Sequence, residues 1–142
     1  MTPVDERVRR SFLKQAFMST LGAELTAADE GVAEIRLPFS PGLTQQNGYM
    51  HAGAVAAVLD SACGYAALSV APAGCEVLSV EFKLNLLAPA TGEVLIAKAQ
   101  VKRAGRTLTV CTADAFALTG SQQKVIATML ATIMRLPMPS AK

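Results

Sequence analysis

Hydrophobic residues follow two different patterns along the chain. Residues 52–70 form an almost unbroken run of small and apolar side chains, which is typical of a helix buried on every side. Residues 78–86 alternate strictly, with apolar side chains at even positions and polar side chains at odd positions, so they predict a strand with one buried face. Further strands are predicted over residues 21–28, 32–39, 94–103, 107–118 and 124–136.

The first residues of the chain predict a second, shorter helix. Between residues 4 and 18, Val8, Phe12 and Phe17 lie close to helical spacing, with charged residues between them. We expect this amphipathic helix to lie over an open edge or end of the fold.

The predicted elements follow the order helix, two strands, long helix, four strands. A sheet wrapped around the long helix lets every strand bury its apolar face against a helix that is apolar all round. We therefore predict an α+β fold with a six-stranded antiparallel sheet, one central helix and a short N-terminal helix. The domain is expected to span residues 21–136, with the N-terminal helix in residues 1–20 and a loose tail in residues 137–142.

Composition narrows the class of protein. The chain is 51% hydrophobic and only 17% charged, against roughly 25% charged residues in typical soluble domains. We therefore expect part of its surface to be covered by another copy, in a homodimer or homotetramer. A net charge of +2 argues against nucleic-acid binding. Three cysteines without a CxxC pair and the lack of an apolar leader favour a reduced, cytoplasmic protein without a metal site.

Asp60 is the one ionisable carboxylate in the predicted central helix. Its charge argues against a membrane span. A buried carboxylate without partners is costly, so we expect it to be paired, protonated or used in chemistry. His51, at the start of the same helix, lies nine positions away, which places the two side chains on opposite sides of the helix and about 13 Å apart along its axis. If Asp60 acts beside a helix start, that start belongs to a second subunit.

The start of the central helix suits the binding of a carbonyl oxygen. The first backbone N–H groups of a helix have no acceptor within it and carry partial positive charge. Small residues at Ala52 and Gly53 leave these groups open to a ligand. Such donors stabilise the oxyanion that forms when a carbonyl is attacked, and a facing carboxylate can attack it or remove a proton from water. This combination suits acyl transfer from a thioester.

Several motifs resemble those of a known family. Asn47-Gly48-x-x-His51-Ala52-Gly53, followed by Leu59-Asp60, resembles the HGG-x6-D signature of hotdog-fold thioesterases of the phenylacetate-pathway (PaaI-like) type. The likeness continues through residues 78–82, 88–92 and 101–106 and covers nearly all of the chain beyond the first helix. The resemblance implies the hotdog fold and the hydrolysis of acyl-CoA thioesters to free acid and CoA, with no metal or organic cofactor.

The resemblance also implies roles for individual residues. Asp60 matches the family's catalytic carboxylate, either nucleophile or general base, which meets the helix end of the neighbouring subunit. Ala52 stands where a backbone N–H contacts the thioester carbonyl, so the helix start at Ala52-Gly53 is the expected oxyanion hole. His51 and Asn47 match residues that shape that end of the site, and Asn47 is a candidate to orient water or the carboxylate.

Two positions leave alternatives open. Ser79 matches a strand hydroxyl that assists water placement in some family members, although a serine on the polar face of a strand is most often simply exposed. At Ala52 the chain departs from the signature, because HAG replaces HGG. Alanine fits there if the residue is helical, whereas a positive φ would exclude it.

A basic cluster gives a candidate site for the rest of the substrate. Lys102, Arg103 and Arg106 lie at a predicted hairpin. Such cations are commonly only solvated, but they are candidates to bind the phosphates of coenzyme A. Three rival functions use the same features: an acyl-thioester hydratase or dehydratase, a non-catalytic acyl-CoA-binding protein, and a purely structural subunit. The expected partner is an acyl-CoA, with neither nucleic acid nor a membrane.

Overall fold

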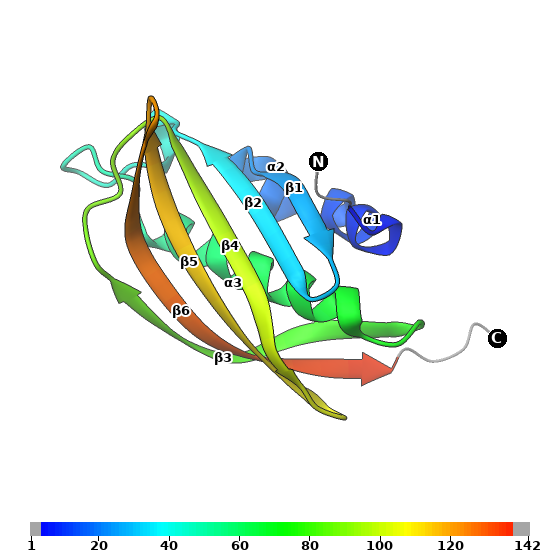
Figure 1. The fold of residues 1–142 in the computed structure, drawn as a ribbon. Coiled ribbons are helices and arrows are strands. Elements are labelled where there is room, and N and C mark those ends of the chain that lie inside the picture. Colours follow the sequence, from blue (N-terminus) through cyan, green and yellow to red (C-terminus); the bar gives the residue numbers. More distant parts are fainter. Residues whose placement is uncertain (1–3, 138–142) are drawn as a thin grey trace.

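A single antiparallel sheet curves around one long helix, with two short helices beside it (Figure 1). The computed structural model describes residues 4–137. The helices are α1 (Glu6–Lys14), α2 (Ala16–Leu21) and α3 (Ala52–Val70), with a short 3-10 helix at Pro41–Leu43. The strands are β1 (Glu24–Asp29), β2 (Val32–Pro38), β3 (Cys75–Leu86), β4 (Val94–Ala104), β5 (Leu108–Thr119) and β6 (Gln122–Pro137). They lie in the order β1-β2-β4-β5-β6-β3, and every neighbouring pair is antiparallel.

The predicted fold class is confirmed, as is the predicted succession of two strands, one long helix and four strands along the chain. The N-terminal region differs from the prediction, because the helix is interrupted at Gln15 and two short helices form in place of one. β1 starts later than predicted, since α2 continues to Leu21 and ends with Gly22 in the left-handed conformation (φ 80). β6 includes Pro137, which the sequence assigned to the tail, and the rest of the predicted tail, 138–142, lies outside the described residues.

The core lies between α3 and the concave face of the sheet. Fully buried side chains along α3 include Val55, Val58, Leu59, Ala62, Cys63 and Ala66. The buried sheet residues include many alanines: Ala33, Ala97, Ala99, Ala113, Ala115 and Ala131. These small side chains let the strands pass close to the helix and wrap it. By length and composition alone α3 also qualifies as a membrane span, a criterion that core helices of globular folds often meet.

The sequence predicted that α3 is buried on every side, but one side of the helix is not fully buried. It contains six residues at helical spacing, none of them fully buried: Gly53, Ala56, Ala57, Asp60, Ser61 and Gly64. The last three face the first residues of β3 across a hollow. The central helix therefore has an open side, and Asp60 lies on it.

β3 is an edge strand, and a β-bulge interrupts its alternation. Ser79 pairs with Ile133, but the next pair is Glu81 with Thr132, so Val80 is the extra residue. Directly opposite residues of an antiparallel pair point to the same face. Because Ile133 is fully buried, Ser79 points toward α3. The expectation that Ser79 shares the polar face of Glu81 is therefore wrong.

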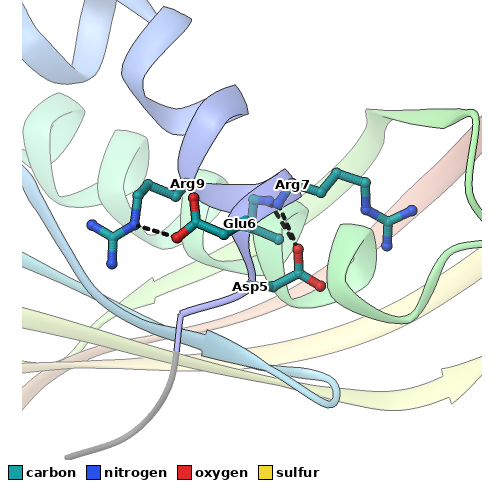
Figure 2. Close-up of polar contacts among 5 residues, drawn as sticks. Asp5, Glu6, Arg7 and Arg9 are labelled. Carbon is teal, nitrogen blue, oxygen red and sulfur yellow. Dashed lines mark hydrogen bonds and ion pairs between the residues drawn. The ribbon is translucent and has the colours of Figure 1, made fainter.

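The first short helix, α1, is tied to the C-terminal end of α3. Asp5 caps α1 by accepting hydrogen bonds from the backbone N–H groups of Arg7 and the following residue (Figure 2). The Arg7 guanidinium donates to the backbone carbonyls of Leu68 (2.6 Å), Ala71 (2.9 Å) and Pro72 (3.1 Å). The last carbonyls of a helix lack intrahelical donors, so Arg7 fixes α1 against the end of α3.

Candidate active site

Two hollows open beside α3, one at each end of β3. The helix-start cavity has a volume of about 590 Å³, and its lining includes Tyr49, His51, Ala52, Val55, Leu86 and Pro89. The carboxylate cavity has a volume of about 430 Å³, and its lining includes Gln15, Asp60, Gly64, Tyr65, Glu76 and Ser79. The two linings have no residue in common. Within one chain Asp60 and the helix start are therefore separate, as their spacing in the sequence predicted.

His51 forms the N-cap of α3. Its Nδ1 accepts a hydrogen bond from the Gly53 backbone N–H at 2.7 Å, and its carbonyl oxygen accepts one from Ala54 N–H at 2.9 Å. Because Nδ1 is an acceptor, a neutral His51 ring carries its proton on Nε2. The Gly53 N–H is thus already bonded to His51 and is not available to a ligand. Of the two residues predicted to form the oxyanion hole, only Ala52 has an N–H that is free within the described residues.

Ala52 offers the free donor at this helix start. Its N–H is the first of α3 and donates to no residue in the described range. Glu30 is the only non-glycine residue of residues 4–137 with a positive φ, so Ala52 has ordinary helical geometry. Alanine therefore fits where the family signature has glycine, and its methyl group requires no backbone strain.

Asp60 is held by the strand beside it. Ser79 Oγ donates a hydrogen bond to Asp60 Oδ1 at 2.5 Å, and the bulge at Val80 directs the serine into this position. Asp60 is only partly buried, and none of the described residues forms an ion pair with it. Its second oxygen, Oδ2, accepts no hydrogen bond from residues 4–137. The structural alternative of a carboxylate paired with a buried cation is thus excluded within the described chain.

A polar network from the N-terminal helices forms another wall of the carboxylate cavity. Gln15 Nε2 donates to the Tyr65 hydroxyl at 2.8 Å, and Ser61 Oγ donates to Gln15 Oε1 at 3.2 Å. Tyr65 also packs its ring against Phe12. A Cβ added to Gly64 would meet nothing within 4 Å, so the helix surface is bare there. Sequence reasoning missed Gln15, because nothing in the local pattern places it beside residues 46 and 50 positions away.

The remaining predicted site residues lie outside both cavities. Asn47 is exposed in the loop before α3, and its backbone N–H donates to Gln45 Oε1 at 2.6 Å. Lys102, Arg103 and Arg106 are exposed around the hairpin between β4 and β5 and line neither cavity.

Two of the cysteines are unsuited to nucleophilic chemistry. Cys63 and Cys111 are fully buried, and Cys111 Sγ donates to the Cys63 carbonyl oxygen at 3.5 Å. Burial raises the pKa of Cys111 to about 11. Burial, Cys111 and the charge of Asp60 together raise the pKa of Cys63 even further above its usual range. The thiols therefore stay protonated, and Cys63 acts in packing.

Comparison with known proteins identifies the family. The sequence model of the Thioesterase superfamily matches residues 47–124. A thioesterase family protein from Silicibacter pomeroyi has a structure that superposes with a TM-score of 0.91 at 49% identity, covering 93% of this chain and 97% of that one. The E. coli PaaI protein from the phenylacetic acid degradation operon superposes with a TM-score of 0.83 at 22% identity, covering 92% of this chain and 91% of PaaI, and so shares the fold.

A sequence relative gives the same family context. "Putative esterase VNG_1336C" of Halobacterium salinarum is 34% identical over 98 residues, which cover 66% of this chain and 64% of the halobacterial protein. The chain thus spans a little under two thirds of that relative. From these findings together, the chain belongs to the Thioesterase superfamily and has the hotdog fold.

Proposed function

We propose that this protein is a homodimeric hydrolase of acyl-CoA thioesters whose active sites lie between the two subunits. One observation carries the proposal: the carboxylate and the free helix-start donor lie in separate cavities of one chain, at opposite ends of the same unpaired edge strand. A single chain holds two halves of a site and cannot join them.

Pairing of β3 with β3 of a second copy joins the halves. When two copies of a strand pair antiparallel about a two-fold axis, the axis passes midway between one residue and the same residue of the other copy. This follows because hydrogen-bonded and non-hydrogen-bonded pairs alternate along the ladder, and the axis must relate pairs of the same kind. Because Val80 is an extra residue, an axis at Phe82 sets Ser79 opposite Leu84 of the other copy, and an axis at Lys83 sets it opposite Leu86. Either register brings the carboxylate cavity of one subunit to the helix-start cavity of the other, since Leu86 and Leu87 line the latter.

The exposed side chains of β3 support such a contact. Phe82 is 47% exposed, Leu86 56% and Leu87 55%, and these apolar groups lie along an unpaired edge. A long exposed apolar edge invites association unless a partner covers it. A second apolar row crosses the outer face of the sheet, where Leu78 pairs with Met134 and Met134 with Leu108. That row suits contact between two dimers in a tetramer.

The chemistry follows from the two halves. The Ala52 N–H of one subunit donates a hydrogen bond to the thioester carbonyl oxygen and stabilises the negative charge that forms there. Asp60 of the other subunit removes a proton from water, or attacks the carbonyl carbon itself, while Ser79 orients its carboxylate. The C–S bond then breaks and the CoA thiolate leaves, taking up the proton that Asp60 removed from water. If Asp60 attacks instead, water hydrolyses the resulting acyl-aspartyl anhydride and supplies that proton. In both routes the acyl group is released as the free acid.

The direct test is Asp60→Asn, with release of the CoA thiol measured on a panel of short, medium and aryl-acetyl CoA substrates. The expected result is loss of turnover in a folded dimer. Asp114→Asn is the matched control, because Asp114 is exposed on β5 and lines neither cavity. Unchanged turnover in a folded Asp60→Asn protein would remove the catalytic role of this carboxylate. Including an enoyl-CoA in the panel separates hydrolysis from hydration.

A further inference from the structure

A groove leads away from Asp60 along α1. The carboxylate cavity adjoins a smaller hollow of about 230 Å³, and the two share Ser11, Lys14 and Glu76. The smaller hollow adds Arg7 and Arg10 to the lining. The shared residues make the two hollows one continuous groove that follows α1 from Gln15 toward its start.

Three cations of α1 share the face that lines this groove. Arg7, Arg10 and Lys14 are spaced by three and four residues, which places them on one side of a helix. Arg9 belongs to another face, pairs with Glu6 at 3.3 Å and extends away from Arg7 (Figure 2). Arg7 is occupied with the carbonyls at the end of α3. Arg10 and Lys14 are exposed and form no ion pair within residues 4–137, so their charges are available to an anion.

The walls of the groove suit a polar chain better than an alkyl chain. Tyr65 accepts a hydrogen bond from Gln15, and its own hydroxyl donates to none of the described residues. Ser11, Ser61 and Glu76 add further polar groups. An alkyl chain buried against such groups would displace their water without replacing its hydrogen bonds. The helix-start cavity, by contrast, is lined mainly by apolar side chains, including Met50, Val55, Leu86, Leu87 and Ile126.

The arm of CoA is long enough for this path. Gln15 and Arg10 are five residues apart along the groove, which corresponds to about 8 Å of helix. The pantetheine arm of CoA has the backbone length of roughly four extended residues, about 14 Å when fully extended. An arm whose sulfur lies beside Asp60 therefore has the length to bring its phosphates to Arg10.

On these grounds, and given the proposed thioesterase function, we infer that the α1 groove binds the pantetheine arm of CoA and that Arg10 and Lys14 bind its phosphates. The acyl group then occupies the apolar helix-start cavity of the other subunit. The hairpin cations Lys102, Arg103 and Arg106 are the rival phosphate site. They lie toward β4, three strand spacings or roughly 14 Å from β3 across the sheet. Glu76 lines the groove as well, and its negative charge opposes the phosphates.

The test measures binding of free CoA and of pantetheine, which lacks the phosphates, by titration calorimetry. The double variant Arg10→Ala/Lys14→Ala is expected to bind CoA roughly tenfold more weakly and pantetheine as before, since charge-assisted contacts to phosphate are lost. Arg9→Ala removes one positive charge from another face of the same helix and is expected to bind CoA normally. Glu76→Gln is expected to bind CoA more tightly than the unmodified protein.

Four results would overturn the inference. They are unchanged CoA binding in the double variant, an equal loss in Arg9→Ala, an equal loss of pantetheine binding in the double variant, and a loss confined to Arg103→Ala/Arg106→Ala. Free CoA needs no turnover to bind, so the outcomes separate. Groove-dependent CoA binding without thiol release refutes the proposed hydrolysis alone. Hydrolysis with an unchanged KM and unchanged CoA binding in the double variant refutes the groove alone.

Discussion

Replacing Ala52 with proline removes the one hydrogen-bond donor that the account assigns to the helix start. Proline has no N–H, and it is well tolerated at the first position of a helix, which Ala52 occupies in α3. The residue before a proline must be extended, and His51 already is, with φ −62 and ψ 138. No hydrogen bond to another described residue is lost, so we expect the free energy of unfolding to change by less than about 1 kcal/mol.

The catalytic effect is expected to be much larger than the effect on stability. Removal of one oxyanion donor lowers kcat by about 100- to 1,000-fold in other hydrolases. Thermal unfolding and thiol release from the same preparation of Ala52→Pro measure both quantities. Ala16→Pro is the matched control, because Ala16 is the first residue of α2 and also follows an extended residue. Retention of turnover by a folded Ala52→Pro protein would refute the role of this N–H.

Three further outcomes follow from the contacts and burial of Ser79 and the cysteines. Ser79→Ala removes the hydrogen bond to Asp60 and is expected to lower kcat about tenfold or more in a folded protein, whereas Ser69→Ala, on α3 away from both cavities, is expected to keep full turnover. In thiol titration at pH 8 the half-buried Cys75 is expected to react first, since with a pKa of about 11 only about one Cys111 thiol in a thousand is ionised. The pKa of Cys111 in the folded state lies above the ordinary value of 9.0. The contribution of the protonated thiol to stability is therefore complete below pH 9 and falls as the pH rises toward 11. Urea unfolding at pH 8 and at pH 10.5 measures this loss. Rapid reaction of all three thiols in the native protein, or a Ser79→Ala protein with full turnover, would contradict these expectations.

Elements with a clear periodicity were predictable from the sequence. The long apolar run gave α3, and period-two alternation gave the strands, because each depends on local spacing alone. Helical geometry also predicted that Asp60 and the helix start occupy separate places in one chain. Since this geometry involves a single rigid helix, no knowledge of the sheet was needed.

Features set by contacts between distant segments were not predictable. The alternation of β3 continues through Leu78, Val80 and Phe82, so the sequence has no sign of the bulge that turns Ser79 toward Asp60. The break at Gln15 has neither glycine nor proline at it, and it is fixed by contacts with α3. The alternative left open at Ala52 depended on one backbone angle, which only the structure supplies.

Complementation between two inactive variants tests the shared active site most directly. Asp60→Asn and Ala52→Pro chains are co-expressed with different tags, and the mixed dimers are assayed for thiol release. In a mixed dimer one site carries both lesions and the other carries none. Random mixing is therefore expected to restore roughly a quarter of the unmodified turnover, since half of the dimers are mixed and each has one intact site. Activity no higher than the average of the two parent proteins would contradict an active site built from two subunits.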